Sequence, residues 1–417
     1  MSKLALRYAS PDLRFAAPSL IAVIFINQLG FGIIVPLLPF FAKSFHAPAW
    51  QIALVFSAYS VGGFFGEPFW GRLSDRCGRK PVLIWTVFGN CLLYAALAHA
   101  PNVATAFAMR FVGGLMSGNG AVVQGYLADV TPANRRSRIF SYIAAAWNVG
   151  LIVGPTIGGI FAHPSAGPAG FRIPLYIAAC LSAASATCIA LFIRESRTRD
   201  HVLGHRPNRW AALGEALAHP AISRLFLLTY LAGFAFTGIE SSFGLWGQAK
   251  FGWGPREVGV CFAFVGVTAA VTQMTLTGRL SERFGEGAML AAGMGVIMVA
   301  AALQPFSTAA PMTITLMCCI AIGQSVAFPN VGALISRTVD PHRQGQILGL
   351  NNAAASLART TGPFCAALGF SHLSIDAPFF QAALIAAPAI WLALTAARRI
   401  GRAEPQAARA PEAVALH

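Results

Sequence analysis

The chain has 417 residues, of which 56% are hydrophobic and only 11% are charged. Soluble globular proteins carry about 25% charged residues, so this composition excludes an ordinary soluble enzyme or binding domain. The formal net charge is +15, and a basic excess of this size is found both in nucleic-acid-binding proteins and in membrane proteins. The position of the basic residues along the chain decides between the two.

Apolar stretches long enough to cross a bilayer recur along the whole chain. A transmembrane helix needs about 20 mostly apolar residues, and backbone groups inside lipid must be satisfied, so long runs are expected as helices and not as barrel strands. Residues 1–19 lack the features of a cleavable signal peptide, so the first run is expected to be retained. The twelve predicted spans are residues 17–42, 52–70, 81–100, 102–127, 138–163, 171–193, 221–246, 256–278, 287–305, 311–335, 344–370 and 376–397.

The basic residues are concentrated on one side of this topology. Arg110 and Arg359 fall within spans. Almost all the others lie on the side that carries both termini, which the positive-inside rule places in the cytoplasm. The basic excess is therefore a topology signal, and no nucleic-acid partner is expected. The basic residues assigned to the opposite side are Lys43, Arg172, Lys250 and Arg256.

Repeated motifs divide the chain into two halves. Gly71-Arg-Leu-Ser-Asp-Arg-Cys-Gly78 recurs as Gly278-Arg-Leu-Ser-Glu-Arg-Phe-Gly285 at an offset of 207, and Gly154-Pro155 recurs as Gly362-Pro363 at an offset of 208. Paired halves are typical of transporters that hold the substrate between them. We predict an all-α membrane protein with twelve transmembrane helices in two pseudo-symmetric six-helix bundles. The predicted parts are the bundles 1–195 and 220–400, a cytoplasmic linker 196–219 and a disordered cytoplasmic tail 401–417.

Several motifs resemble those of the major facilitator superfamily. The segment Gly71 to Leu83 is similar to the signature loop of that family, and Arg110 in span four lies in a second family motif. The span-five motif resembles that of the drug:proton antiporter branch, and residues 30–39 and 343–346 resemble tetracycline-efflux pumps. The likeness covers nearly the whole chain and implies a secondary active transporter that works by alternating access. The antiporter-motif residues are Gly150, Gly154, Pro155, Gly158 and Gly159.

The signature loop is expected to gate transport. Asp75 and Arg76 are expected in a loop of about ten residues, where a carboxylate favours a helix N-terminus. The resemblance implies that Asp75 meets the start of span eleven and that Arg76 meets Asp129. Alternatively, these charges only fix the topology. The predicted gating residues are Gly71, Asp75, Arg76, Gly78, Arg79, Asp129, Glu282 and Arg283.

The span-five glycines have two interpretations. Glycines allow close helix–helix contact, and Pro155 removes one backbone hydrogen bond and bends the helix. The motif therefore fits the antiporter branch, but generic helix packing can use the same residues. Because Gly362-Pro363 occurs in the second half, a Gly-Pro kink alone does not decide between them.

Ionisable residues inside spans are costly and are functional candidates. The spans contain Glu67, Arg110, Glu240 and Arg359. Burial favours the neutral form of a carboxyl group and a nearby guanidinium favours the charged form, so Glu240 with Arg110 is the predicted proton-coupling pair. Glu67, near the cytoplasmic surface, is the third coupling candidate, and the alternative is that it belongs to the gate. A structural hydrogen bond or ion pair is the alternative for Glu240, and Arg359 either attracts an anionic substrate or counters a carboxylate.

Neutral polar and aromatic residues of the spans form the predicted substrate cavity. Such a lining suits amphipathic or aromatic molecules, although each residue can equally bridge two helices. The predicted substrate-binding residues are Asn27, Gln28, Tyr59, Gln124, Asn148, Phe243, Trp246, Gln273, Gln324, Asn330, Asn351, Asn352 and Arg359. Three polar residues of the tetracycline pumps are replaced here by Asn27, Leu93 and Ala269, so tetracycline–magnesium is not the expected cargo.

The leading hypothesis is proton-coupled efflux, of the multidrug-efflux kind, of a small lipophilic or amphipathic molecule. The expected partners are this small molecule, protons and membrane lipid. The protein is expected to act as a monomer in the bacterial inner (plasma) membrane. The alternative is a proton-coupled symporter that imports a metabolite or an organic anion. No enzyme motif is present in a suitable setting, and the eight cysteines lack metal-site spacing, so no enzymatic activity, cofactor or metal is expected.

Overall fold

The computed structural model is almost entirely helical over the residues that it describes, and it contains no β-strand among them. These residues fall into two compact units. Unit 1 lies within Met1–Gly204, Glu240–Val267 and Phe370–Ile375, and unit 2 lies within His205–Ile239, Thr268–Gly369 and Asp376–His417. The described residues are 13–117, 120, 122–123, 125–126, 146, 149–150, 152–196, 209–339 and 344–414.

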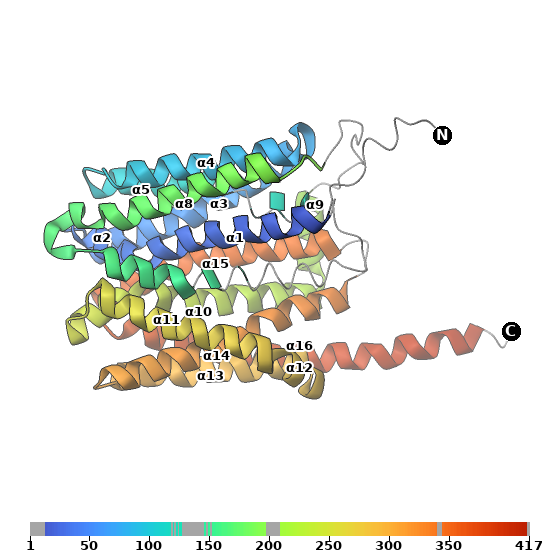
Figure 1. The fold of residues 1–417 in the computed structure, drawn as a ribbon. Helices are drawn as coiled ribbons and strands as arrows, with labels where there is room; N and C mark the ends of the chain where they lie inside the picture. Colours follow the sequence, from blue (N-terminus) through green and yellow to red (C-terminus); the bar gives the residue numbers. More distant parts are fainter. Residues whose placement is uncertain are drawn as a thin grey trace, which may run out of the picture. The chain divides into compact units, whose positions relative to one another are not determined.

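Each predicted span contains a helix among these residues (Figure 1). The first half contains α1 (Leu13–Ile34), η2 (Val35–Leu37), α2 (Leu38–Lys43), α3 (Ala49–Cys77), α4 (Arg79–Leu97), α5 (Val103–Leu115), a helix at Ile152–Phe161, η3 (Pro164–Phe171) and α8 (Arg172–Phe192). The second half contains α10 (Pro220–Phe251), α11 (Pro255–Thr272), η4 (Gln273–Thr277), α12 (Gly278–Phe284), α13 (Glu286–Leu303), η5 (Gln304–Phe306), α14 (Ala310–Thr338), α15 (Gln344–His372) and α16 (Ala377–Val414). The helix α9 (Arg209–Ala218) lies in the predicted linker.

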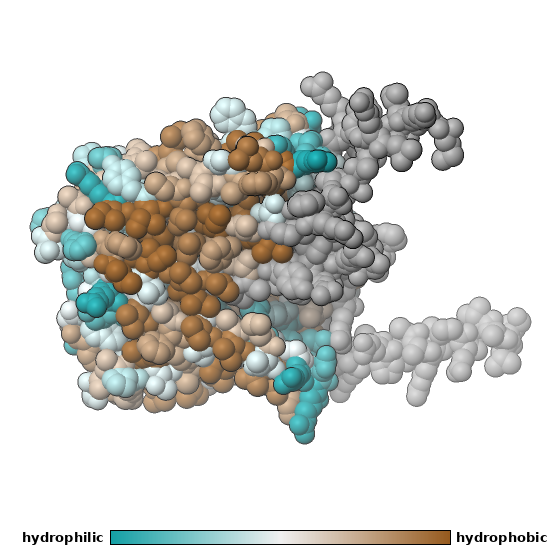
Figure 2. Space-filling model, viewed as in Figure 1, coloured by the Kyte–Doolittle hydropathy of each residue, from teal (hydrophilic) through white to brown (hydrophobic). Residues whose placement is uncertain are grey.

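Nine helical segments of the described chain are long and apolar enough to cross a membrane. α5 and the helix Ile152–Phe161 are shorter apolar helices. α15 has 29 residues, but polar residues such as Asn351, Asn352 and Arg359 lower its hydropathy. Large apolar side chains such as Leu191, Met274 and Leu384 are 71%, 81% and 75% exposed. Figure 2 shows hydrophobic side chains along the helices and hydrophilic ones gathered toward helix ends, as expected for surfaces that face lipid.

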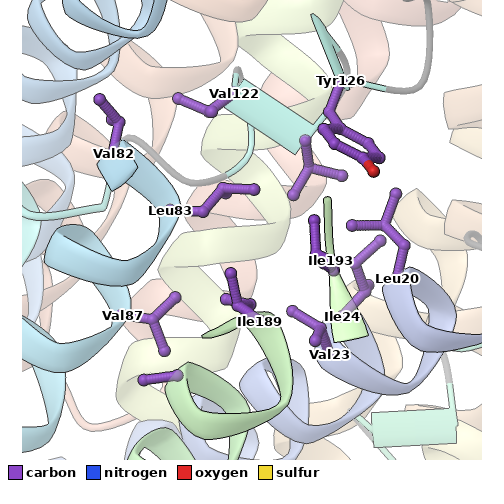
Figure 3. Close-up of a cluster of buried hydrophobic side chains, with 12 residues drawn as sticks. Leu20, Val23, Ile24, Val82, Leu83, Val87, Val122, Tyr126, Ile189 and Ile193 are labelled. Carbon is purple, nitrogen blue, oxygen red and sulfur yellow. The ribbon is translucent and has the colours of Figure 1, made fainter. Parts of the chain in front are cut away.

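A hydrophobic core holds α1, α4 and α8 together in unit 1 (Figure 3). Val23, Leu83 and Ile189 come from these three helices and are almost fully buried. Tyr126 belongs to the same cluster, and its hydroxyl donates a hydrogen bond of 3.0 Å to the carbonyl oxygen of Arg194. The end of α8 is therefore attached to Tyr126.

The units do not follow the predicted boundary between the bundles. Residues 240–267 belong to unit 1 although they come after the predicted linker. The cause is packing at the end of α10, where Lys43 Nζ donates a hydrogen bond of 2.7 Å to Gln248 Oε1 and the Phe40 ring lies against Gly244.

The C-terminal segment also differs from the prediction. α16 continues to Val414 (Figure 1), so the backbone of residues 401–414 is helical where the sequence predicts a disordered tail. Alanine, arginine, glutamine and glutamate dominate this segment, and all four are good helix formers.

The two halves differ in backbone structure at equivalent positions of one helix. In the first half, Pro68 lies inside α3. The equivalent residue of the second half, 207 positions later, is Thr275, which lies in the π-helix η4 between α11 and α12. The Thr277 hydroxyl lies 3.2 Å from the carbonyl oxygens of both Thr272 and Ser325, so the π-turn is attached to α14.

Candidate transport and gating site

The signature segment forms a one-residue turn between two helices. α3 continues to Cys77 and α4 begins at Arg79, so Asp75 and Arg76 lie on a helix and not in the predicted loop of about ten residues. Gly78 has φ +101°, a conformation that L side chains rarely adopt. One glycine therefore reverses the chain, and no longer loop is needed.

Asp75 forms an ion pair across this turn. Its Oδ1 lies 2.9 Å from Arg79 Nη2, and Arg79 Nη1 donates a hydrogen bond of 2.6 Å to Ser74 Oγ. Arg79 is buried, and its guanidinium lies against Gly125, where an added Cβ would approach Cζ to 2.5 Å. The buried charge of Arg79 is therefore compensated by Asp75, whereas Arg76 is exposed. Asp129, the partner that the resemblance implies for Arg76, lies outside the described residues.

Glu195 is a contact of this turn that the sequence did not predict. Its Oε1 accepts a hydrogen bond of 2.8 Å from the backbone N–H of Arg79, and its Oε2 accepts one of 3.0 Å from that of Lys80. Lys80 Nζ in turn donates 2.7 Å to the carbonyl oxygen of Ala190 at the end of α8. The first N–H groups of a helix have no partner within the helix and favour a negative charge. The feature of the sequence that could have indicated this cap is a carboxylate directly after an apolar span.

The second copy of the motif has the same backbone but different side-chain contacts. Gly285 has φ +81° and separates α12 from α13. Glu282 and Arg283 are exposed, and Arg283 lies over the ring of its neighbour Phe284 at 5.4 Å. Ser281, the equivalent of Ser74, donates a hydrogen bond of 2.9 Å to Asn330 Oδ1. The backbone turn is thus duplicated, whereas the buried arginine is not.

The glycines of the span-five motif face two different helices. A Cβ added at Gly150 would lie 2.9 Å from Gln28, and one at Gly154 would lie 2.7 Å from Gly32. Gly158 faces α1 as well, with the carbonyl oxygen of Ile33 at 2.6 Å from an added Cβ. Residues four apart share one helix face, so these three glycines allow the helix Ile152–Phe161 to approach α1 closely.

Gly159 lies on a different face and touches α11. A Cβ at Gly159 would lie 2.6 Å from the carbonyl oxygen of Pro255, and one at Gly259 would lie 2.7 Å from that of Pro155. In the second half, Gly362-Pro363 packs on α10, with Thr237 Oγ1 at 2.5 Å from an added Cβ on Gly362. The position equivalent to Gly159 is Ala367. The contact with α11 therefore distinguishes the span-five motif from its second copy.

Arg110 is buried among the helices of unit 1. It is 3% exposed, and its Cζ lies 4.6 Å from the centre of the Tyr59 ring. Glu67 lies on α3 close enough to interact electrostatically with Tyr59. Glu240 is half-buried on α10. Within the described residues Arg110 forms no ion pair, so the predicted pairing of Arg110 with Glu240 is not formed in this structure.

The predicted cavity residues are found in several environments. Phe243 and Trp246 are fully buried, and their rings stack at 6.0 Å, so they pack inside unit 1. Asn330 and Asn351 are held by other side chains: Asn351 Oδ1 accepts a hydrogen bond of 2.6 Å from Thr229. Asn352 and Arg359 are exposed, Gln28 is buried, and Asn27, Tyr59, Gln273 and Gln324 are half-buried. Gln124 and Asn148 lie outside the described residues.

The helical fold, the duplicated turns and the close-packed glycines define a membrane transporter. The family model described as Major Facilitator Superfamily matches residues 20–274 and 225–416, so the chain belongs to this family and is a multi-pass membrane protein.

Curated relatives match most of the chain, and a solved structure shares its fold. It is 29% identical over 357 residues to the class C tetracycline resistance protein of Escherichia coli, covering 82% of this chain and 87% of that protein. It is 26% identical over 375 residues to multidrug resistance protein 2 of Bacillus subtilis (strain 168), covering 88% and 91%. A bacterial homologue of the human lysosomal transporter Spinster, solved in an inward-facing and occupied conformation, has the same fold, with a TM-score of 0.76, 14% identity and coverage of 94% and 98%.

Proposed function

We propose that this protein exports a small lipophilic or amphipathic molecule in exchange for protons, by alternating access in the bacterial inner membrane. The observation that carries the proposal is the span-five motif, in which three glycines face α1 and Gly159 faces α11. Relatives named for tetracycline and multidrug resistance match more than four fifths of the chain. In this proposal both termini are cytoplasmic, as the basic residues indicate, and the protein acts as a monomer.

Glu240 is the proposed proton carrier. It is a carboxylate well inside a span and is half-buried, and an ionisable group in that position is expected to have a function. Glu67 and Arg110 are proposed to influence the binding and release of the proton by Glu240. The neutral polar residues Asn27 and Gln28 of α1 are proposed to orient the cargo, because a mostly apolar site needs few polar groups to do so.

The signature segment is the proposed cytoplasmic gate. The ion pair between Asp75 and Arg79 and the cap formed by Glu195 connect α3, α4 and the end of α8. We propose that this connection is made in one state of the transport cycle and weakened in the other. Arg76, Asp129, Glu282 and Arg283 are also proposed as gating residues.

Transport in inverted membrane vesicles tests the function. An imposed acid interior should drive a fluorescent amphipathic probe such as Hoechst 33342 into the vesicles, and a protonophore should abolish this accumulation. Vesicles without the protein give the baseline. Accumulation driven only by the opposite gradient would instead support the alternative, a proton-coupled symporter that imports a metabolite or an organic anion.

A further inference from the structure

The interior of unit 1 contains an arginine, Arg110, that no carboxylate of the described residues compensates. Arg110 is 3% exposed, and its Nε and Nη1 atoms have no hydrogen-bond partner among the described residues. It forms no ion pair with a described carboxylate. A guanidinium is not deprotonated in proteins, and an unpaired buried charge is strongly unfavourable. A counter-charge is therefore needed at this position.

A second unsatisfied polar group lies beside it. Asn90 on α4 is 4% exposed, and its Oδ1 has no hydrogen-bond partner among the described residues. A Cβ added at Gly113, one turn along α5 from Arg110, would lie 3.7 Å from Asn90 Oδ1 and 3.7 Å from the Tyr59 ring. The guanidinium lies over that same ring. Three helices thus bring Tyr59, Asn90 and Arg110 to one place.

The surrounding groups suit a negatively charged ligand. Tyr94 on α4 is buried and close enough to interact electrostatically with Arg110. Two donor nitrogens of Arg110, Nε and Nη1, have no partner among the described residues, and rotation of the Asn90 amide presents its NH2 group in place of Oδ1. The only carboxylate near the cluster on the packed helices α3, α4 and α5 is Glu67, which interacts with Tyr59 and has contacts of its own.

We propose that Arg110 and Asn90, beside Tyr59, form a binding site for one small, singly charged anionic group inside unit 1. The ligand is either free chloride or the acidic group of an organic molecule. The guanidinium donates two hydrogen bonds to it and the Asn90 amide donates a third, while the Tyr59 ring supports the guanidinium from one side. The inference stands independently of proton-coupled export, because binding at this site is measured without transport.

Thermal unfolding of the detergent-purified full-length protein tests the site. Sodium chloride is titrated against sodium gluconate at constant ionic strength, and sodium benzoate is titrated in the same way. Chloride or benzoate should raise the unfolding midpoint by about 1–3 °C near ten times the dissociation constant, and the midpoint should go on rising with the logarithm of the anion concentration above it. A response to chloride identifies a free anion as the ligand, and a response to benzoate alone identifies an organic acid. An unchanged midpoint with both probes overturns the proposal.

Variants separate this site from a general salt effect. Arg110→Gln should remove the response, whereas Arg172→Gln, which removes an equal charge from an exposed residue of unit 1, should keep it. If Arg110→Gln does not fold, Arg110→Lys and Asn90→Leu serve instead, and each should raise the anion concentration that gives a set rise of the midpoint about tenfold or more. An unchanged concentration for that rise in both of these variants, or in Arg110→Gln, overturns the proposal.

Discussion

Single residues at the cytoplasmic turn act through contacts that lie far apart in the sequence. Glu195 accepts hydrogen bonds from residues 115 and 116 positions away. No local pattern predicts such a contact. The motif predicted Asp75 and Arg79 among the gating residues, but it did not predict the ion pair between them.

Glu195→Ala tests the helix cap. Loss of a side-chain cap typically costs about 1 kcal/mol of stability, because the N–H groups of Arg79 and Lys80 lose their acceptors. We expect a lower unfolding midpoint in detergent, with a smaller decrease for Glu195→Gln, which keeps one acceptor oxygen. Glu282→Ala, at an exposed position of α12, is the control. A Glu195→Ala midpoint equal to that of the control would mean that the cap contributes nothing.

Asp75→Asn tests the gate. The change leaves the buried guanidinium of Arg79 without its compensating charge, so the state in which this contact forms becomes less favourable. A shift of 1–3 kcal/mol changes the ratio of two states by about 5- to 150-fold. We expect transport to fall while the protein stays inserted, as measured by vesicle accumulation at equal membrane content. Normal transport by the inserted variant would exclude an essential role for the pair.

At the scale of helices, hydropathy predicted the spans well and the turns poorly. Every predicted span contains a helix because the length of an apolar run sets the length of a membrane helix. The polar ends of α3 and α12 continue as helix beyond the predicted spans, because a helix does not end where the lipid ends. The sequence signal for the true end was Gly78, and Gly285 in the second copy, each at positive φ.

Gly159→Ala tests the contact between the span-five helix and α11. A Cβ at Gly159 would lie within 2.6 Å of a backbone oxygen that cannot move aside easily. Overpacking of this kind costs typically about 1–3 kcal/mol, so Gly159→Ala should lower the unfolding midpoint and reduce transport. Gly278→Ala adds the same methyl group where nothing lies within 4 Å and should leave the midpoint unchanged or slightly higher. Equal midpoints in the two variants would argue against close packing.

At the scale of the whole molecule, the duplication predicted two bundles but not how the residues divide. The end of α10 and most of α11 pack with the first half of the chain. Contacts such as that between Lys43 and Gln248 join segments about 200 residues apart, and neither hydropathy nor the repeat indicates them. The polar candidates of the cavity could be named from the sequence. The degree of burial of each candidate could not be predicted from the sequence: Asn27 is half-buried and Trp246 is fully buried.

Glu240→Gln tests the coupling of the whole cycle. Glutamine keeps the shape of the side chain and its hydrogen bonds but cannot ionise. If Glu240 carries the proton, the variant should still bind cargo but should lose gradient-driven transport. Cargo binding should also lose its pH dependence, because that dependence requires a group that titrates. The measurement is proton movement on addition of Hoechst 33342 to proteoliposomes, compared with the parent protein at equal reconstitution. An undiminished proton signal would transfer the role to Glu67 or Asp129.

The equivalent positions Pro68 in α3 and Thr275 in η4 have a consequence for how the two halves diverged. One copy has a proline inside a continuous helix, and the other has a π-turn of five residues. Prolines and π-turns each disturb the regular backbone hydrogen bonds and are common causes of helix bends. Both copies therefore disturb these hydrogen bonds at the same place, just before the repeated motif, but with different residues. A residue-by-residue comparison of the halves finds no identical residue at these five positions although they have the same place in the architecture.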